Sequence, residues 1–429
     1  MKKANYENAF VTIVVVVFIC VKLYFIYQSE MNGAYRTAAA MTNGDAGHFL
    51  RIGKNIADFN VYSDTNSSIV SEEATWRTPL WPFILSIFFR ITDNITVIIA
   101  LKAFFEFGLL AFIFRKIFKV LQLKPIHFLP FLLILIEPQY LKYSITFLTE
   151  SLTAILLLLL VIYFISPRLT KTNTIIISIL SGLLLLCHPI LVFCVVSILG
   201  FFLLYTLKKS IPVALAGGLI FIIIVLSWPL RNAATFHKGF YLTASQGATF
   251  SKGWNEKVVT DFNNVDGDMA DESKNLKFVS KEQSSTVNGI LETSKLYREA
   301  TLNFISTLDT KQIVQIAAIK LKSNFNPFPE RPKKGFLESA SSLFRCLYLL
   351  NFIFLFFRIL KWRKFDFNSI TDKVYLVILS IFIGQFFMSI YFYTGIRFNA
   401  VYSLTSLFCF LYLVMSFLQK RYKKTLPFS

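Results

Sequence analysis

The chain has 429 residues, of which 55% are hydrophobic and 47 are phenylalanine, and its mean hydropathy is +0.57. This apolar content excludes an ordinary soluble domain and indicates an all-α, polytopic membrane protein. The formal net charge of +19 does not indicate nucleic-acid binding, because the basic residues outside one large polar region cluster in short loops between apolar runs, as the positive-inside rule describes.

The first predicted element is a membrane-spanning helix. An apolar run from about Phe10 to Tyr27 follows Lys2 and Lys3 and is long enough to cross a bilayer. The alanines at 38–40 leave a cleaved signal peptide as an alternative, but the run is long for one, so we expect a retained anchor. In both cases the next loop lies on the extracytoplasmic side.

The first outer loop, residues 28–93, contains a polar stretch that predicts a short amphipathic helix lying flat at the membrane interface. Asn43 would cap this helix and Asp45 would lie in its first turn. The loop closes with Trp76–Pro82 (WRTPLWP), in which Arg77 stands among indoles and prolines. A carboxylate and an arginine at one membrane surface suit a substrate with a lipid tail and an anionic head. The predicted apolar face consists of Ala46, Phe49, Leu50, Gly53, Ile56 and Ala57.

Seven spans are predicted in the first half of the chain. Segment 79–91 is too short for a full span, and we interpret it as re-entrant or interfacial. On this count the basic loops around Lys116, Lys171 and Lys208 are all cytoplasmic. The two spans around His188 are short enough to be half-helices that meet a polar cavity. After the first span, the spans are predicted at 94–114, 126–144, 148–165, 174–187, 189–207 and 211–229.

The rest of the chain divides into an extracytoplasmic region, residues 230–342, and a C-terminal module, residues 343–429. The outer region is polar, and helical patterns occur in it at 288–305 and 311–322. With the N-terminal module, residues 1–229, the prediction is about ten transmembrane helices, two cytoplasmic termini and a small outer domain. The last three spans are predicted at 343–360, 374–394 and 398–418.

Ionisable residues gather at the predicted outer face. Charged groups at the ends of transmembrane helices are costly to bury, so several at one depth suggest a shared site. Taken singly, an outer arginine is more often a lipid-headgroup anchor, Asp45 would complement a helix dipole, and His188 would be a helix-end polar residue. Glu150, in an otherwise apolar stretch, is harder to explain in this way. The candidate site residues are Asp45, His48, Arg77, Glu150, His188, Arg231 and Arg397.

Other chemistries find little support in the sequence. The acidic run 266–272 lacks the spacing and the closing glutamate of a calcium loop, and we interpret it as a solvated loop. The absence of P-loop, GxSxG, HExxH and CxxC motifs argues against nucleotide-driven, serine-hydrolase and zinc chemistry. No metal ligands are assigned. The cysteines lie in or beside apolar runs as small fillers: Cys20, Cys187, Cys194, Cys346 and Cys409.

The order of these motifs resembles the GT-C glycosyltransferases, in particular the bacterial aminoarabinose transferases and the protein O-mannosyltransferases. Asp45, in GDAGHFLRIGKNIADFNVYS, is similar to their first-loop acidic motif. Trp76–Pro82 is similar to the basic-proline motif that closes that loop. Thr149–Leu152 (TESL) is similar to their second acidic motif, at the outer junction of the third and fourth spans.

Later segments extend the resemblance over most of the chain. LCHP at 186–189, SWPLRN at 227–232 and GIRF at 395–398 are similar to family motifs, with histidine in place of arginine in the first and phenylalanine in place of tyrosine in the last. Ala46 and Phe49 depart from the glutamate and tyrosine that many relatives carry in the first motif. This departure bears on a metal role of that motif more than on the role of its aspartate.

The resemblance implies an inverting transfer of a sugar from a polyprenyl-phosphate carrier to an acceptor hydroxyl. Asp45 would take the proton of the acceptor, and Glu150 would orient the acceptor or share the site. Arginines would stabilise the leaving phosphate, since their planar guanidinium suits bidentate contact with phosphate. The expected substrate-binding residues are His48, Arg77, His188, Arg231 and Arg397.

The same resemblance implies a bacterial inner or plasma membrane protein whose active site faces the extracytoplasmic side. The expected partners are the lipid-linked donor, a glycan, lipid or protein acceptor, and the bilayer, with no nucleic acid. No cofactor is expected with certainty, and a divalent cation stays open.

Two other functions are compatible with the composition. A transporter or flippase for a lipid-linked saccharide would share the basic cavity, but would more naturally show internal repeats. A polysaccharide polymerase or ligase of another membrane class would place its arginines in a large late loop and would not need the early Asp45. A structural membrane scaffold is a third, weaker alternative.

Overall fold

In a computed structural model the protein is an all-α, multi-pass membrane protein, with no strand among the residues that are described. Most of the predicted first span, the Asn43 cap and nearly all of the acidic run 266–272 lie outside these residues. Apart from scattered positions between Ile13 and Tyr24, the described residues are 44–65, 68–122, 129–167, 170–260, 272–280, 289–327, 336–361, 365–392 and 396–425.

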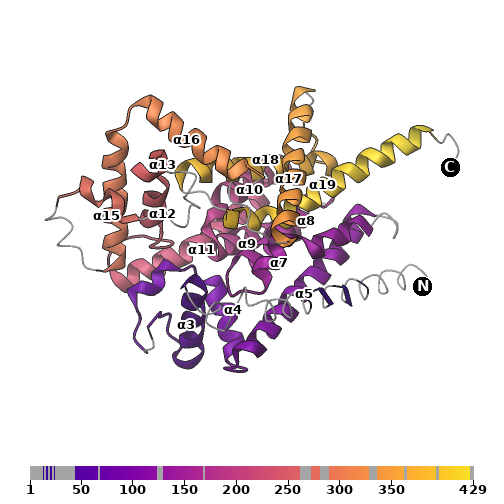
Figure 1. Cartoon of the computed structure of the whole chain (residues 1–429). Helices are drawn as coiled ribbons and strands as arrows, with labels where there is room; N and C mark the ends of the chain where they lie inside the picture. Colours follow the sequence, from indigo (N-terminus) through magenta and orange to yellow (C-terminus); the bar gives the residue numbers. More distant parts are fainter. Residues whose placement is uncertain are drawn as a thin grey trace.

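The helices form one bundle with an outer part at its side. Figure 1 shows α8 and α9 in the middle, α3 and α4 together at the lower edge, and α12, α13 and α15 at the left. In chain order the elements, with η for short 3₁₀ helices, are α3 (Gly44–Phe59), η1 (Glu72–Trp76), α4 (Leu80–Phe89), α5 (Ile95–Leu121), η2 (Leu129–Ile136), α7 (Pro138–Ser144), α8 (Glu150–Ile165), α9 (Lys171–Cys187), η3 (Pro189–Leu191), α10 (Val192–Leu207), α11 (Ile211–Phe236), α12 (Gln246–Gly253), α13 (Glu256–Thr260), η6 (Glu272–Phe278), α15 (Ile290–Ser306), α16 (Thr310–Phe325), α17 (Phe336–Leu360), α18 (Ile370–Tyr391) and α19 (Ile396–Thr425).

Six helices of the described residues are long and apolar enough to cross a membrane, and each coincides with a predicted span. Two further predicted spans, α8 and α9, are helical but have only 16 and 17 residues. The helix α4 has ten residues, about 15 Å at the usual rise, against a hydrocarbon core of about 30 Å, so it cannot cross alone. The six long apolar segments are Ile95–Leu121, Pro189–Leu207, Ile211–Phe236, Ser339–Leu360, Ile370–Tyr391 and Arg397–Gln419.

The expectation of one continuous span over 126–144 is wrong, because the helix breaks at Glu137. The side chain of Glu137 accepts hydrogen bonds from the backbone N–H groups of Gln139 and Tyr140 and so caps a new helix, α7. Pro138 at the first position of α7 has no N–H to continue the preceding turn. The expected end of the seventh span near Pro229 is also wrong, since α11 continues through that proline to Phe236.

The centre of the bundle is α8, in which every residue from Glu150 to Ile165 is buried. Its sequence is apolar on all sides, as a helix surrounded by other helices requires. It contacts α5, α7, α9, α18 and α19. The first residue of this buried helix is Glu150, and its carboxylate is therefore held at a fixed place at one end of the core.

The first outer loop folds back onto the bundle through α3 and α4. The predicted apolar face of α3 is buried except for the half-buried Ala57, and it packs on α4. The two helices approach most closely at Gly53, where a Cβ atom would lie 2.8 Å from the Cβ atom of Leu85. Glycine is required there by space, and the close crossing fixes the first turn of α3.

The outer region consists largely of α12, η6, α15 and α16, and its two predicted helices correspond to α15 and α16. Asn275 links three of its segments by donating to the Trp254 carbonyl at 2.6 Å and to the Thr301 hydroxyl at 3.1 Å. Both the Trp254 indole and the buried Lys320 ammonium donate to the Ile390 carbonyl, at 2.9 and 2.8 Å. The outer region is thereby tied to the end of α18.

Candidate active site

Four charged side chains from three distant parts of the sequence form one chain of ion pairs. Arg77 pairs with one carboxylate oxygen of Asp45, and Arg397 Nη1 lies 2.7 Å from the other. Arg397 also pairs, through Nε, with Glu150 Oε1. The order is therefore Arg77–Asp45–Arg397–Glu150, two cations and two anions in alternation.

The elements that carry these residues explain their convergence. Asp45 lies in the first turn of α3, Glu150 is the first residue of α8, and Arg397 lies at the start of α19. Arg77 follows η1 in extended backbone. All four stand at the beginnings or ends of helices, where chain direction changes and side chains can face a common point.

The backbone around Arg77 is fastened on several sides. Its carbonyl accepts a hydrogen bond from the Tyr62 hydroxyl at 3.0 Å. The next residue, Thr78, donates to the Cys187 carbonyl at the end of α9, at 2.8 Å. On the other side Thr243 donates to the Trp76 carbonyl, also at 2.8 Å. The arginine is held in place by the first loop, by a membrane helix and by the outer region together.

Burial and charge act on Asp45 in opposite directions. Burial would raise the pKa of this carboxyl, but Arg77 and Arg397 lower it to about 2 from 3.8. Asp45 is therefore ionised at neutral pH while both arginines are in place. Its side chain is 34% exposed, whereas Glu150 is 0% exposed, so the cluster opens to solvent on the Asp45 side.

Three buried polar atoms around the cluster have no hydrogen-bond partner among the described residues. They are the Nε of Arg77, the Oε2 of Glu150 and the Nδ1 of His188. Unpaired buried polar atoms cost free energy unless something else satisfies them. A donor, an acceptor and an imidazole nitrogen at one place indicate a site for a polar ligand.

His188 lies in the turn between α9 and η3, and its ring contacts Phe398 edge-on, with 6.1 Å between ring centroids. Burial lowers the pKa of His188 to about 4; the nearby Glu150 carboxylate acts in the opposite direction and Arg397 in the same direction, both with smaller effects. The imidazole is therefore neutral at physiological pH and stands beside the ion-pair chain as a hydrogen-bonding group.

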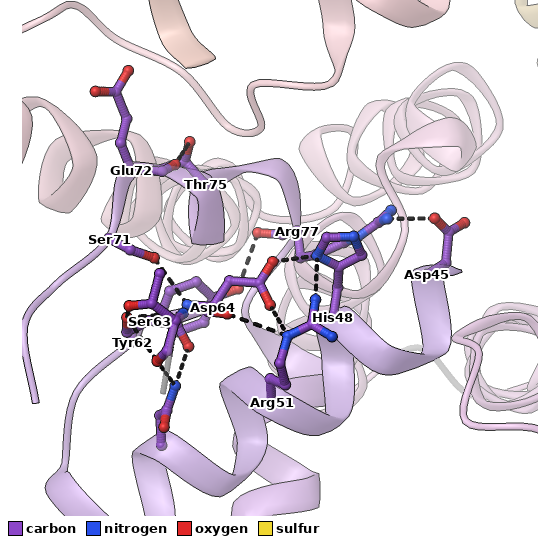
Figure 2. Close-up of polar contacts among 12 residues, drawn as sticks. Asp45, His48, Arg51, Tyr62, Ser63, Asp64, Ser71, Glu72, Thr75 and Arg77 are labelled. Carbon is purple, nitrogen blue, oxygen red and sulfur yellow. Dashed lines mark hydrogen bonds and ion pairs between the residues drawn. The ribbon is translucent and has the colours of Figure 1, made fainter. Parts of the chain in front are cut away.

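His48, which is predicted to bind substrate, contacts Asp64 in the structure. It is one turn after Asp45 on α3, but its Nδ1 bonds to the buried carboxylate of Asp64. Arg51 pairs with the same carboxylate at 2.9 Å. Figure 2 shows Asp64 reaching His48 and Arg51, while Asp45 meets Arg77. His48 thus helps to hold the loop that follows α3, and its hydrogen bonds with described residues are to Asp64 and Arg51, outside the ion-pair chain.

Arg231 is likewise separate from the ion pairs. Its guanidinium lies over aromatic rings, 4.9 Å from the ring centroid of Trp228 and 5.5 Å from that of Tyr62. Because the Tyr62 hydroxyl donates to the Arg77 carbonyl, Arg231 packs on the residue that supports Arg77. It is half-buried, and it hydrogen-bonds Asn232 at 3.0 Å.

Sequence reasoning missed three residues that organise this end of the molecule. Asp64 stands in a polar loop beside several other carboxylates, and nothing in the sequence distinguishes it. Lys102 and Glu106 are different, because two ionisable residues four apart in an apolar run are a visible signal. They form a fully buried ion pair in α5 that contacts the beginning of α8.

No group of three or more His, Cys, Asp or Glu side chains that could hold a metal ion occurs among the described residues. Comparisons with protein-family models, with curated proteins and with solved structures gave no match.

Proposed function

We propose that the protein is a membrane glycosyltransferase of the GT-C type. It moves a sugar from a polyprenyl-phosphate carrier to an acceptor hydroxyl, with inversion at the anomeric carbon. The observation that carries the proposal is the ion-pair chain Arg77–Asp45–Arg397–Glu150, which unites two arginines and two carboxylates in one cluster. Guanidinium groups suit contact with phosphate.

The phosphate of the donor is the ligand for the two arginines. In the structure, Asp45 pairs with both of them. A phosphate has more charge and more acceptor oxygens than a carboxylate, and it would also meet the unpartnered Nε of Arg77. The donor therefore displaces Asp45 from the guanidinium groups as it binds.

This exchange also turns Asp45 into a base. Between two arginines its pKa is about 2, which makes it a poor proton acceptor. When phosphate neutralises the arginines, the lowering influence is lost and burial raises the pKa. The carboxylate is then available to the acceptor hydroxyl, while Glu150 Oε2 and the neutral His188 orient the acceptor.

The reaction exchanges one bond at the anomeric carbon and moves one proton. The acceptor oxygen bonds to the anomeric carbon, the bond from that carbon to the phosphate oxygen breaks, and the phosphate leaves with the electron pair. The proton of the acceptor passes to Asp45. Because the leaving phosphate is already an anion, it needs the arginines and no general acid.

The same proposal includes ten spans and a site on the extracytoplasmic face of a bacterial plasma membrane. The six long apolar helices support a multi-pass topology, and the basic loops support the orientation. The outer region contacts the loop that carries Arg77, for example through the Ala244 N–H to the Thr75 carbonyl at 2.9 Å. Acceptor choice is its proposed role.

The test is transfer of labelled sugar from polyprenyl-phosphate sugars by the purified protein, with wild type and Asp45→Asn compared. We expect turnover in the wild type and a loss of about 10²- to 10⁴-fold in the variant, the usual contribution of a general base. Labelled sugar that crosses the bilayer of a vesicle without joining an acceptor would instead establish a transporter.

A further inference from the structure

The core of the membrane region contains an ion pair that the proposed chemistry does not use. Lys102 and Glu106 lie one turn apart on α5, each with 1% of its side chain exposed, and 2.7 Å separates Nζ from Oε1. Charges this deep in an apolar bundle are expensive, and a pair of apolar residues would usually serve stability as well or better. The pair therefore calls for a role other than stability.

Both charged groups contact residues that flank the turn 145–149, which joins α7 to α8. Lys102 Nζ donates to the Ser144 carbonyl at 2.8 Å and to the Ser151 hydroxyl at 3.0 Å. The Ser151 hydroxyl donates in turn to Glu106 at 2.6 Å. The pair thus holds the chain on both sides of the turn, at Ser144 before it and at Ser151 after it.

Further hydrogen bonds hold this turn and the helix before it. The Tyr140 hydroxyl donates to Glu106 at 3.3 Å, and the Trp81 indole donates to the Phe147 carbonyl at 2.7 Å. Thr149, which precedes α8, gives no side-chain cap. Contacts from α4 and α5 therefore help to place the first turn of α8.

Ser151 follows Glu150 in the chain, so the hydrogen bonds that hold Ser151 also restrain the position of Glu150. Glu150 uses Oε1 for Arg397 and leaves Oε2 buried without a partner among the described residues. Where Oε2 lies is set by the backbone of this turn. A single peptide unit, between Glu150 and Ser151, thus connects the α5 pair to the ion-pair chain.

We propose that Lys102 and Glu106 are positioning residues for the transfer reaction. Through Ser151 they hold Glu150 at the depth where it pairs with Arg397 and presents Oε2 to the acceptor. The proposal rests on the proposed function for its catalytic consequence, but the placement of Glu150 that it describes can be measured without turnover.

The first experiment uses Ser151→Ala, which removes the bridging hydroxyl and keeps the charges of both Lys102 and Glu106. Ser181→Ala is the matched control, because Ser181 is also fully buried, on α9, and its hydroxyl has no partner among the described residues. We expect kcat to fall about tenfold in Ser151→Ala, with KM for the lipid-linked donor within about twofold of wild type, since the arginines are untouched. Ser181→Ala should match the wild type.

The second experiment measures coupling by thermal unfolding in detergent. The loss of Tm caused by Arg397→Ala is determined in wild type, in Ser151→Ala and in Ser181→Ala. We expect the loss to be smaller by about half in the Ser151→Ala background and unchanged in the control background, because a misplaced Glu150 gains less from Arg397.

Equal Tm losses in all three backgrounds would overturn the positioning role, as would a Ser151→Ala protein with unchanged kcat. If the wild type transfers no sugar from any lipid-linked donor, the proposed function fails, and the unfolding experiment still decides whether the α5 pair positions Glu150.

Discussion

At the scale of single residues, Asp45 separates two arginines that would otherwise repel each other, and Arg397 in turn separates two carboxylates. Each ion therefore depends on its neighbours, and removal of one leaves an unpaired charge beside buried groups. A second anion at this place would compete with Asp45 for the two arginines, because Asp45 pairs with both of them. In the proposed mechanism, this competition links the binding of a phosphate to the basicity of the carboxylate.

The neutral imidazole of His188 gives a pH-dependent prediction. Burial lowers its pKa to about 4 from 6.5, so between these values the unfolded chain binds a proton that the folded protein does not. Stability therefore falls as pH drops from 6.5 towards 4, and this contribution is constant above that window. His188→Gln should show a weaker loss of stability over the window, measured by thermal unfolding at pH 7 and pH 4.5.

The control for this measurement is His237→Asn. His237 is exposed and has a positive φ of 55°, which asparagine tolerates better than most residues. Its pH profile should follow the wild type. A His188→Gln protein that loses stability between the two pH values as steeply as wild type would show that His188 is not a buried neutral group.

A site residue could be predicted from the sequence where a physical rule connects its charge with the membrane. Asp45, Glu150 and Arg397 were selected because ionisable groups at helix ends near one bilayer face are costly, and the structure brings them into contact. The partner of His48 could not be predicted, because the loop that brings Asp64 to it follows no periodic pattern. Arg231 lies over aromatic rings, and its contact with a phosphate stays a prediction.

At the scale of elements, the close crossing of α3 and α4 sets the position of Asp45. An alanine at Gly53 would place its Cβ 2.8 Å from that of Leu85 and 3.3 Å from the Pro82 carbonyl oxygen. The Cβ atom of Leu85 is fixed to the backbone of α4 and cannot rotate away. Gly53→Ala should therefore push α3 outward and lower the free energy of unfolding by about 1–3 kcal/mol. Thermal or denaturant unfolding measures the loss, and transfer activity should fall with it.

Gly108→Ala is the matched control for this substitution. Gly108 also lies inside a helix, α5, but a Cβ there meets no atom within 4 Å. Alanine should leave stability unchanged or raise it by up to about 1 kcal/mol, because it favours the helix. Equal effects of the two substitutions would mean that the α3–α4 contact does not constrain the loop.

Most element types could be predicted from hydrophobic runs, because a helix that crosses a bilayer must be long and apolar. Six predicted spans coincide with such helices. The break at Glu137 was missed because the run around it is apolar enough to count as one span, whereas the Glu137 carboxylate caps a new helix that begins at Pro138. The end of α11 was placed too early because proline usually stops a helix, whereas α11 continues through Pro229.

At the scale of the whole molecule, Glu72 joins the first loop to the outer region. Its carboxylate accepts from the Leu291 N–H at 2.8 Å, in the first turn of α15, and pairs with Lys238 at 3.1 Å. Gly289, which precedes α15, provides no side-chain cap, so Glu72 takes that place from a distant segment. The loop that carries Arg77 is thereby coupled to the domain proposed to select the acceptor.

Glu72→Ala should loosen this junction without unfolding the membrane region. A hydrogen bond to a charged acceptor is lost, and we expect hydrogen exchange of the Leu291 amide to become about tenfold faster. Hydrogen–deuterium exchange with mass spectrometry measures it. Glu73→Ala, which changes an exposed neighbour, should leave the exchange at wild-type rate, and equal exchange in both variants would contradict the coupling.

Asp45 should compete with the donor for the arginines before it acts as the base. The decisive measurement is made on one preparation of Asp45→Asn in lipid nanodiscs, with affinity for polyprenyl phosphate and turnover of polyprenyl-phosphate sugar both determined. We predict binding about tenfold tighter than wild type, because the arginines are released, together with loss of turnover. Weaker binding, or tighter binding with normal turnover, would contradict the account.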